Sequence, residues 1–306
     1  MEQALKNRLT YGPLMLAGLF LLLWLDHAFE LRTHGWLGKY APETRGVGGV
    51  GILILLLIIL PVAVRELAQL FSAENVRPYR FLTALGSGLL VIHAFCTQFP
   101  KFQPIAASTL AFILVMIMIA VALTHAINKQ TDQAIVHMAG TVLAMLYLGG
   151  LAWFIIALRV KHSPHPAPEG FHGSTMTILM ILLVVKFTDI GAYFGGRALG
   201  KHKLIPWLSP GKTWEGLICG VLTAGAVGAI CAAWMLNLHW HRALAFGIVI
   251  GAVGQAGDLL ESMMKRDAEV KDSGKIIPGF GGILDVIDSP LLAAPFAYLV
   301  FSLFAR

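Results

Sequence analysis

Charged residues are scarce in this chain. Asp, Glu, Lys and Arg together make up 13% of its 306 residues, whereas soluble domains carry roughly 25%. Hydrophobic residues reach 57%. This balance excludes an ordinary soluble domain and indicates an integral membrane protein.

Strand-length segments with alternating polar and apolar residues are also missing, which excludes an outer-membrane barrel. The apolar runs are continuous instead, and a helix needs about 20 such residues to cross a bilayer. They lie near residues 11–28, 46–64, 80–98, 104–126, 135–160, 174–196, 215–236, 242–260 and 284–305. We therefore expect an all-α polytopic membrane protein with about nine transmembrane helices.

Cysteine is rare, and its spacing matches no metal centre. Cys96, Cys219 and Cys231 lie within or beside the apolar runs, where a free thiol packs as a small apolar residue.

The histidines of residues 162–172 are interrupted by three prolines, which favour an irregular connector over a metal site.

The Lys and Arg residues are unevenly distributed between the loops. They gather at residues 65–80, 197–212 and 265–275, which fall on one side if successive spans alternate in direction. The positive-inside rule then predicts a cytoplasmic N-terminus. We expect the protein in the inner membrane, or another membrane facing the cytoplasm, with its charged loops exposed to cytoplasmic nucleotides.

The two halves of the chain differ in character. Residues 1–160 consist mainly of apolar spans with short loops, which we interpret as a scaffold in contact with lipid. Residues 174–306 contain polar residues inside the spans, which indicates a catalytic transmembrane domain. A charge near the bilayer centre costs about 2.5–3.5 kcal/mol on insertion scales, so such residues require a polar cavity or a partner.

One polar stripe follows the span near residues 174–196. Lys186, Asp189, Tyr193 and Arg197 recur every three or four residues and so share one face of a helix. They predict a polar cavity, with a structural Lys186–Asp189 pair as the alternative.

The loop after this span is basic and rich in glycine. Gly211-Lys212-Thr213 looks like the end of a phosphate-binding P-loop, but Pro206 occupies the position where that motif needs glycine. This excludes a P-loop nucleoside triphosphatase. The loop instead leads into a helix whose first backbone N–H groups could bind an anion.

The most polar stretch runs from residue 257 to residue 288. Asp258, Glu261 and Lys265 form one face at the end of an apolar helix, and Asp285 and Asp288 begin the last one. Carboxylates on separate elements, with lysines nearby, suit Mg²⁺ and a nucleoside triphosphate. Ion pairs at helix ends, such as Glu261–Lys265, are the alternative.

These residues resemble the signature of the phosphatidate cytidylyltransferase (CDP-diacylglycerol synthase) family. The matching C-terminal positions are Ser262, Lys265, Arg266, Lys271, Asp272, Gly274, Pro278, Gly281, Gly282, Asp285 and Asp288. Earlier matching positions are Asp189, Gly191, Tyr193, Gly200, Lys201, Ser209, Lys212, Thr213, Glu215, Gly216, Gly257, Asp258 and Glu261. The resemblance covers roughly residues 180–306.

The resemblance implies transfer of a cytidylyl group from CTP to phosphatidate, which gives CDP-diacylglycerol and pyrophosphate for phospholipid biosynthesis. It implies that Asp258 and Asp285 bind Mg²⁺, with a second cation as a further option, and that Glu261 and Asp288 support them. The implied residues for binding phosphate or CTP are Asp189, Tyr193, Ser209, Lys212, Thr213, Glu215, Ser262, Lys265, Arg266, Lys271 and Asp272. The expected partners are CTP, a phospholipid and the bilayer, without nucleic acid, and a homodimer is one option for assembly.

Two positions depart from the family signature. Phe280 replaces a histidine and Val286 replaces an arginine. If those residues contact CTP or pyrophosphate, each loss costs about 2–4 kcal/mol of transition-state stabilisation. These departures leave a weakened family member as one alternative. A CTP-dependent enzyme for another lipid, such as a polyprenol kinase, and an ion-coupled transporter that uses the buried charges as an ion path are two others.

Overall fold

A computed structural model of the chain describes residues 2–33, 36, 46–129, 132–160, 173–235 and 239–304. The connector expected at residues 162–172 lies outside the described residues. The helices are α1 (Glu2–Arg32), α2 (Val50–Ala73), α3 (Arg80–Cys96), η1 (Gln103–Ile105), α4 (Ala106–Ile127), α5 (Ala134–Met145), η2 (Leu146–Gly150), α6 (Leu151–Val160), α7 (Gly173–Leu199), α8 (Trp214–Met235), α9 (Trp240–Asp267) and α10 (Leu284–Phe304). Two short strands, β1 (Lys203–Ile205) and β2 (Ser209–Thr213), form an antiparallel hairpin.

Each of the apolar runs expected from the sequence coincides with a helix. Within the described part of the chain, eight helical segments are long and apolar enough to cross a membrane, and α3 is apolar but shorter. The segments α5, η2 and α6 together make one of the eight. The expectation of an all-α, multi-pass membrane protein is therefore confirmed.

The chain divides into two compact units. The first contains residues 1–160 and 267–286, and the second contains residues 161–266 and 287–306. Packing therefore assigns the segment 267–286 to the same unit as the N-terminal helices. The roles that we expect for residues 1–160 and 174–306, scaffold and catalysis, stay predictions because packing does not test them.

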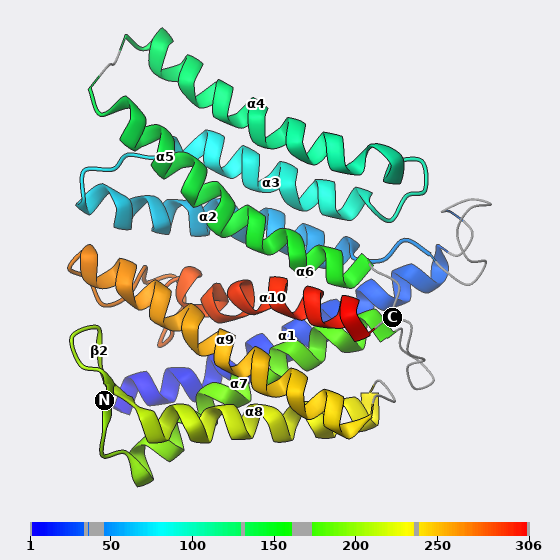
Figure 1. Cartoon of the computed structure of the whole chain (residues 1–306), viewed down its shortest axis with the longest axis vertical. Helices are drawn as coiled ribbons and strands as arrows, with labels where there is room; N and C mark the ends of the chain where they lie inside the picture. The colour runs from blue at the N-terminus through cyan, green and yellow to red at the C-terminus, as the bar shows by residue number, and fades with distance from the viewer. Residues whose placement is uncertain are drawn as a thin grey trace. The chain divides into compact units, whose positions relative to one another are not determined.

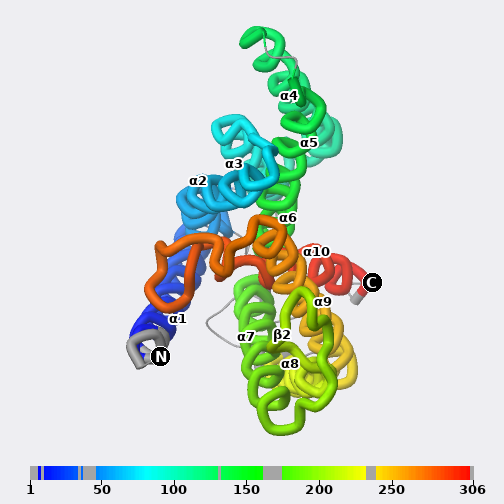
Figure 2. Tube along the Cα trace, turned by 90° about the vertical axis from the view of Figure 1, so that its left-hand side faces the viewer, coloured from blue at the N-terminus to red at the C-terminus, as the bar shows by residue number. Residues whose placement is uncertain are grey.

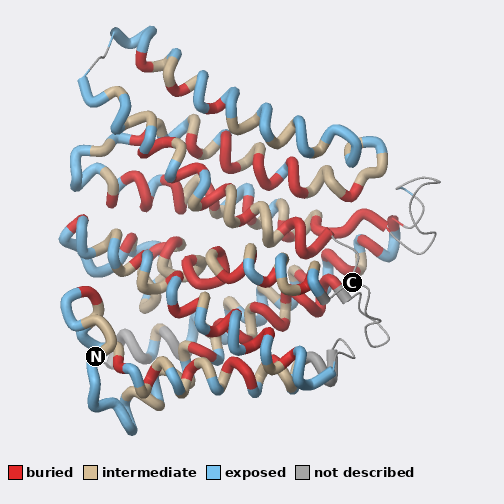
Figure 3. Tube along the Cα trace, in the orientation of Figure 1, coloured by how far each residue is buried: buried red, intermediate tan, exposed pale blue. Residues whose placement is uncertain are grey.

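In the first unit, α3 is the central helix. It packs against α2, α4, α5 and α6, and Figure 1 shows these helices as neighbours. Leu90 of α3 joins Ile117, Val121 and Met145 in a buried apolar core. Most of the α4 surface remains exposed (Figure 3), as its apolar composition allows if lipid covers it.

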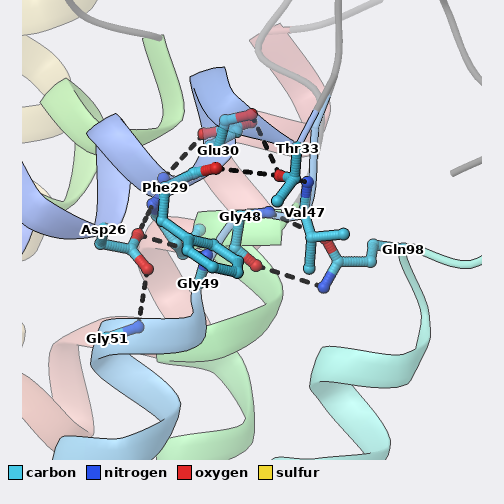
Figure 4. A network of polar contacts seen from close by, with 10 residues as sticks. Asp26, Phe29, Glu30, Thr33, Val47, Gly48, Gly49, Gly51 and Gln98 are labelled. Carbon is cyan, nitrogen blue, oxygen red and sulfur yellow. Dashed lines mark hydrogen bonds and ion pairs between the residues drawn. The ribbon is translucent and has the colours of Figure 1, made fainter. Parts of the chain in front are cut away.

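A buried ion network ties α1 to α6 and to the start of α2 (Figure 4). Arg159 Nε lies 2.7 Å from Asp26 Oδ2, and Arg159 Nη2 lies 2.7 Å from Glu30 Oε2. The backbone N–H groups of Gly49 and Gly51 also donate to Asp26, at 3.2 and 2.7 Å. Arg159 is completely buried, so these contacts replace the water that the charges lose.

The second unit is built on close approach of α7, α8 and α9, which lie side by side in Figures 1 and 2. A Cβ on Gly220 of α8 would lie 2.8 Å from the Thr188 carbonyl oxygen of α7. A Cβ on Gly228 would lie equally near the Ala243 carbonyl oxygen of α9. Only glycine allows the backbones to come this close, as is common between membrane helices.

Candidate functional site

A cavity of about 490 Å³ opens in the second unit. Its walls come from α7, the β1–β2 hairpin, the start of α8 and the later part of α9. Among the residues predicted from the sequence, it is lined by Asp189, Tyr193, Ser209, Lys212, Thr213 and Asp258. Folding thus gathers residues from three separate sequence blocks around one space.

The α7 wall of the cavity carries the predicted polar stripe. Asp189 Oδ1 accepts a hydrogen bond of 2.8 Å from Gln255 Nε2 of α9. Arg197 Nη1 donates to the Tyr193 hydroxyl group at 3.2 Å. Tyr193 is 60% exposed, so its ring is available to a ligand.

Gln255 was not among the residues predicted from the sequence. It also lines the cavity and is only 5% exposed. An amide inside an apolar helix, three residues before Asp258 and therefore on nearly the same face, is the signal that could have identified it.

The central charge pair of the cavity joins the hairpin to α9. Lys212 Nζ lies 2.8 Å from Asp258 Oδ2, and the two side chains are 20% and 36% exposed. Ser262 Oγ donates to Asp258 Oδ1 at 3.3 Å. The carboxylate of Asp258 is therefore open to a cation, whereas Lys212 Nζ is itself buried against it, so that an anion would bind the lysine only by displacing this contact.

An acidic cluster lies at the same end of α9. Oxygen atoms of Asp258, Glu261 and Asp288 all lie within 4.8 Å of one another. Lys265 Nζ lies 3.1 Å from Glu261 Oε2. Counting the nearby Asp189, four carboxylates face the ammonium groups of Lys186, Lys212 and Lys265, which leaves a negative balance when all are ionised. Carboxylate oxygens are the ligands that Mg²⁺ prefers. The cluster therefore fits a divalent cation.

Asp285, the other predicted metal ligand, belongs by packing to the first unit. Its Oδ2 atom accepts hydrogen bonds from Ser273 N at 3.0 Å, from Ser273 Oγ at 2.9 Å and from Gly282 N at 2.7 Å. Joint binding of one metal by Asp258 and Asp285 stays a prediction. Within the second unit, Asp258 has Glu261 and Asp288 as its acidic neighbours.

Three further predicted residues hold the hairpin in place. Thr213 Oγ1 accepts a hydrogen bond from Gly216 N at 3.1 Å and so caps α8. Glu215 accepts hydrogen bonds from the backbone N–H groups of Lys201 and His202. Arg266 Nε donates to the carbonyl oxygen of Leu208, in the turn between the strands, at 3.3 Å.

The remaining predicted residues, Lys271 and Asp272, are exposed in the first unit, next to the buried Ser273. Their predicted contact with phosphate or CTP stays a prediction.

Comparison with known proteins points to one family. Residues 43–304 match the model of the cytidylyltransferase family. A phosphatidate cytidylyltransferase of Synechocystis sp. is 30% identical over 272 residues, which cover 82% of this chain and 88% of that protein.

Two shorter matches have higher identity. A phosphatidate cytidylyltransferase of Haemophilus influenzae is 43% identical over 147 residues, or 46% of this chain and 50% of that protein. The uncharacterized protein YnbB of Escherichia coli is 36% identical over 162 residues, or 53% of this chain and 51% of that protein. The match thus spans about half of the length of these two relatives.

Proposed function

Because this chain belongs to the cytidylyltransferase family, we propose that it transfers the cytidylyl group of CTP to phosphatidate and releases pyrophosphate. The observation that carries the proposal is the Lys212–Asp258 pair, which faces a cavity beside the acidic cluster of Asp258, Glu261 and Asp288. This site offers a cationic group for phosphate and carboxylates for a cation at the end of membrane helices.

The reaction requires little proton transfer. An oxygen of the phosphatidate phosphate forms a bond to the α-phosphorus of CTP, the bond from that phosphorus to the bridging oxygen of pyrophosphate breaks, and pyrophosphate leaves. Because the attacking phosphate is already anionic, the protein acts mainly by positioning the substrates and neutralising charge. Phosphate contacts are assigned to Lys212, Lys265, Arg266 and Lys271.

The acidic cluster and Asp285 are proposed to hold Mg²⁺, with a second cation as a further option. When bound, Mg²⁺ would neutralise the triphosphate. Ser209 and Thr213 are proposed to bind phosphate or base, and Asp189 and Tyr193 to line the CTP pocket. The acyl chains of phosphatidate would stay in the bilayer while its headgroup enters the cavity.

We place the site on the cytoplasmic side of the inner membrane, as the distribution of Lys and Arg favours. A homodimer is one option for its assembly. Cysteine labelling from each side of sealed vesicles, at a cysteine introduced at exposed Lys201, tests the orientation. Crosslinking in the membrane tests the dimer.

Purified protein with Mg²⁺, labelled CTP and phosphatidate tests the activity directly. We expect labelled CDP-diacylglycerol and pyrophosphate in equal amounts. Asp285→Asn is expected to abolish turnover while the protein remains folded in the membrane. Unchanged turnover in this variant would remove Asp285 from the site. If the unmodified protein forms no product with any divalent cation, the proposal that it is an active enzyme is contradicted.

A weakened enzyme is the second candidate, favoured by Phe280 and Val286. Phe280 faces α1, since a Cβ on Gly12 would lie 3.5 Å from its Cζ atom. Phe cannot donate a hydrogen bond and Val carries no charge for a phosphate. If the chain is a weakened enzyme, Phe280→His with Val286→Arg should raise turnover. If neither the unmodified protein nor the double variant forms CDP-diacylglycerol, cytidylyl transfer to phosphatidate is rejected.

A further inference from the structure

Glu66 of α2 is a buried carboxylate that lies outside the predicted site. It is 4% exposed. Its Oε1 atom accepts a hydrogen bond of 3.1 Å from Ile283 N, and its Oε2 atom accepts one of 2.8 Å from Leu284 N. These N–H groups lie at the start of α10, where the helix offers them no acceptor of its own. Glu66 thus caps a helix that begins more than 200 residues later.

Glu66 and Asp285 accept hydrogen bonds from three consecutive backbone N–H groups. The N–H of Gly282 donates to Asp285 Oδ2, whereas the next two N–H groups donate to Glu66. The hydroxyl group of Ser273 lies between the carboxylates, 2.9 Å from Asp285 Oδ2 and 3.5 Å from Glu66 Oε2. Any shift of Glu66 therefore alters the donors that orient Asp285.

The glycines of this segment pack directly on Glu66. A Cβ on Gly282 would lie 2.6 Å from Glu66 Oε2, and one on Gly274 would lie 3.0 Å from Glu66 Cδ. A side chain at either position would therefore press on the Glu66 carboxylate and displace it. In Figure 2 this segment, in orange, passes beside α1 and α2 within the first unit.

We propose that Glu66 is a positioning residue, which fixes the start of α10 so that Asp285 is oriented for binding of the divalent cation. This inference rests on the proposed function, which gives Asp285 that role. Partners that orient a metal ligand typically change metal affinity or activity by about 10- to 100-fold when they are replaced. Glu66→Gln keeps the side-chain volume but exchanges one acceptor oxygen for an NH₂ group, which faces a backbone donor.

The test compares Glu66→Gln with Glu74→Gln, which makes the same charge change at an exposed position just beyond the end of α2. Hydrogen exchange of the peptide 279–286 reports the contact itself and is expected to accelerate in Glu66→Gln alone. Binding of Mn²⁺ alone, without CTP or lipid, is expected to weaken by about tenfold or more. Turnover is expected to fall by a similar factor, with the KM for phosphatidate unchanged.

A double-mutant cycle on Mn²⁺ binding tests whether Glu66 acts through Asp285. If it does, Glu66→Gln adds nothing to the effect of Asp285→Asn. Additive losses, or Mn²⁺ binding and turnover equal to those of Glu74→Gln, would overturn the inference. Absence of product from the unmodified protein would reject the proposed activity, whereas hydrogen exchange and Mn²⁺ binding would still decide the role of Glu66.

Discussion

The two units each place charged residues inside apolar helices, but the two clusters differ in how they are satisfied. Arg159, Asp26 and Glu30 are at most 2% exposed, and two backbone N–H groups complete the shell of Asp26. Lys212 and Asp258 are paired at nearly the same distance, 2.8 Å against 2.7 Å, yet remain partly exposed in a cavity. Accessibility therefore distinguishes the closed cluster from the candidate site, whereas the length of the ion pair does not.

This difference follows from the cost of burying charge. A closed network loses its hydration and must be compensated by its own partners, so an added ligand would have to displace a contact. In the partly exposed pair, the Asp258 carboxylate keeps part of its hydration, which a cation can replace. A charged residue inside a membrane helix thus suggests a functional site. Whether its charge is already fully paired within the protein indicates if the residue is structural or can bind a ligand.

Removing one member of the closed network should give the largest effect. Arg159→Met leaves two buried carboxylates without their cation, and breaking a buried pair costs about 3–5 kcal/mol. Thermal unfolding in detergent measures the loss, with exposed Arg242→Met as the control. A combined replacement of Arg159, Asp26 and Glu30 by apolar residues should recover most of it. Unchanged stability of Arg159→Met would show that the closed network does not stabilise the fold.

Asp258→Asn should leave stability near that of the unmodified protein but lower kcat by at least about 100-fold, on the scale of other losses of electrostatic stabilisation at active sites. Asp267→Asn, an exposed change at the end of the same helix, is the matched control. Turnover of labelled CTP and the unfolding temperature should be measured together. Loss of stability without loss of turnover would place Asp258 with the structural cluster.

Lys212→Met should mainly weaken CTP binding. A charge-assisted hydrogen bond contributes about 1.5–3 kcal/mol, so the KM for CTP should rise by at least about tenfold. Lys201→Met changes an exposed lysine at the base of the same hairpin and should have little effect. An unchanged KM with a lower unfolding temperature would mean that the Lys212–Asp258 pair is structural.

Thr213→Val should give the smallest effect, a loss of about 1 kcal/mol in the free energy of unfolding, because the replaced hydroxyl group caps α8. Denaturant unfolding measures it, and Thr10→Val, at an exposed position of α1, is the control. A rise in the KM for CTP that exceeds the stability loss would show that Thr213 also contacts substrate.

Much of the fold could be predicted because apolar runs long enough to cross the bilayer leave few alternatives to helices. The stripe of Asp189, Tyr193 and Arg197 could be predicted in the same way, since helical spacing places nearby residues on one face. Glu66 could not, because its partners Ile283 and Leu284 lie more than 200 residues further along the chain, where α10 begins. Asp26 and Glu30 are four residues apart, and helical spacing places them on one face, but it does not identify Arg159 as their partner.

The order and nature of the helices, and the residues that match the family signature, follow from the amino-acid sequence alone. The contacts of Lys212 with Asp258, of Gln255 with Asp189 and of Arg159 with two carboxylates become visible only in the folded chain. Sequence periodicity shows which residues are neighbours along a single helix or strand. Hydration and pairing of a charge depend on the elements that pack against it.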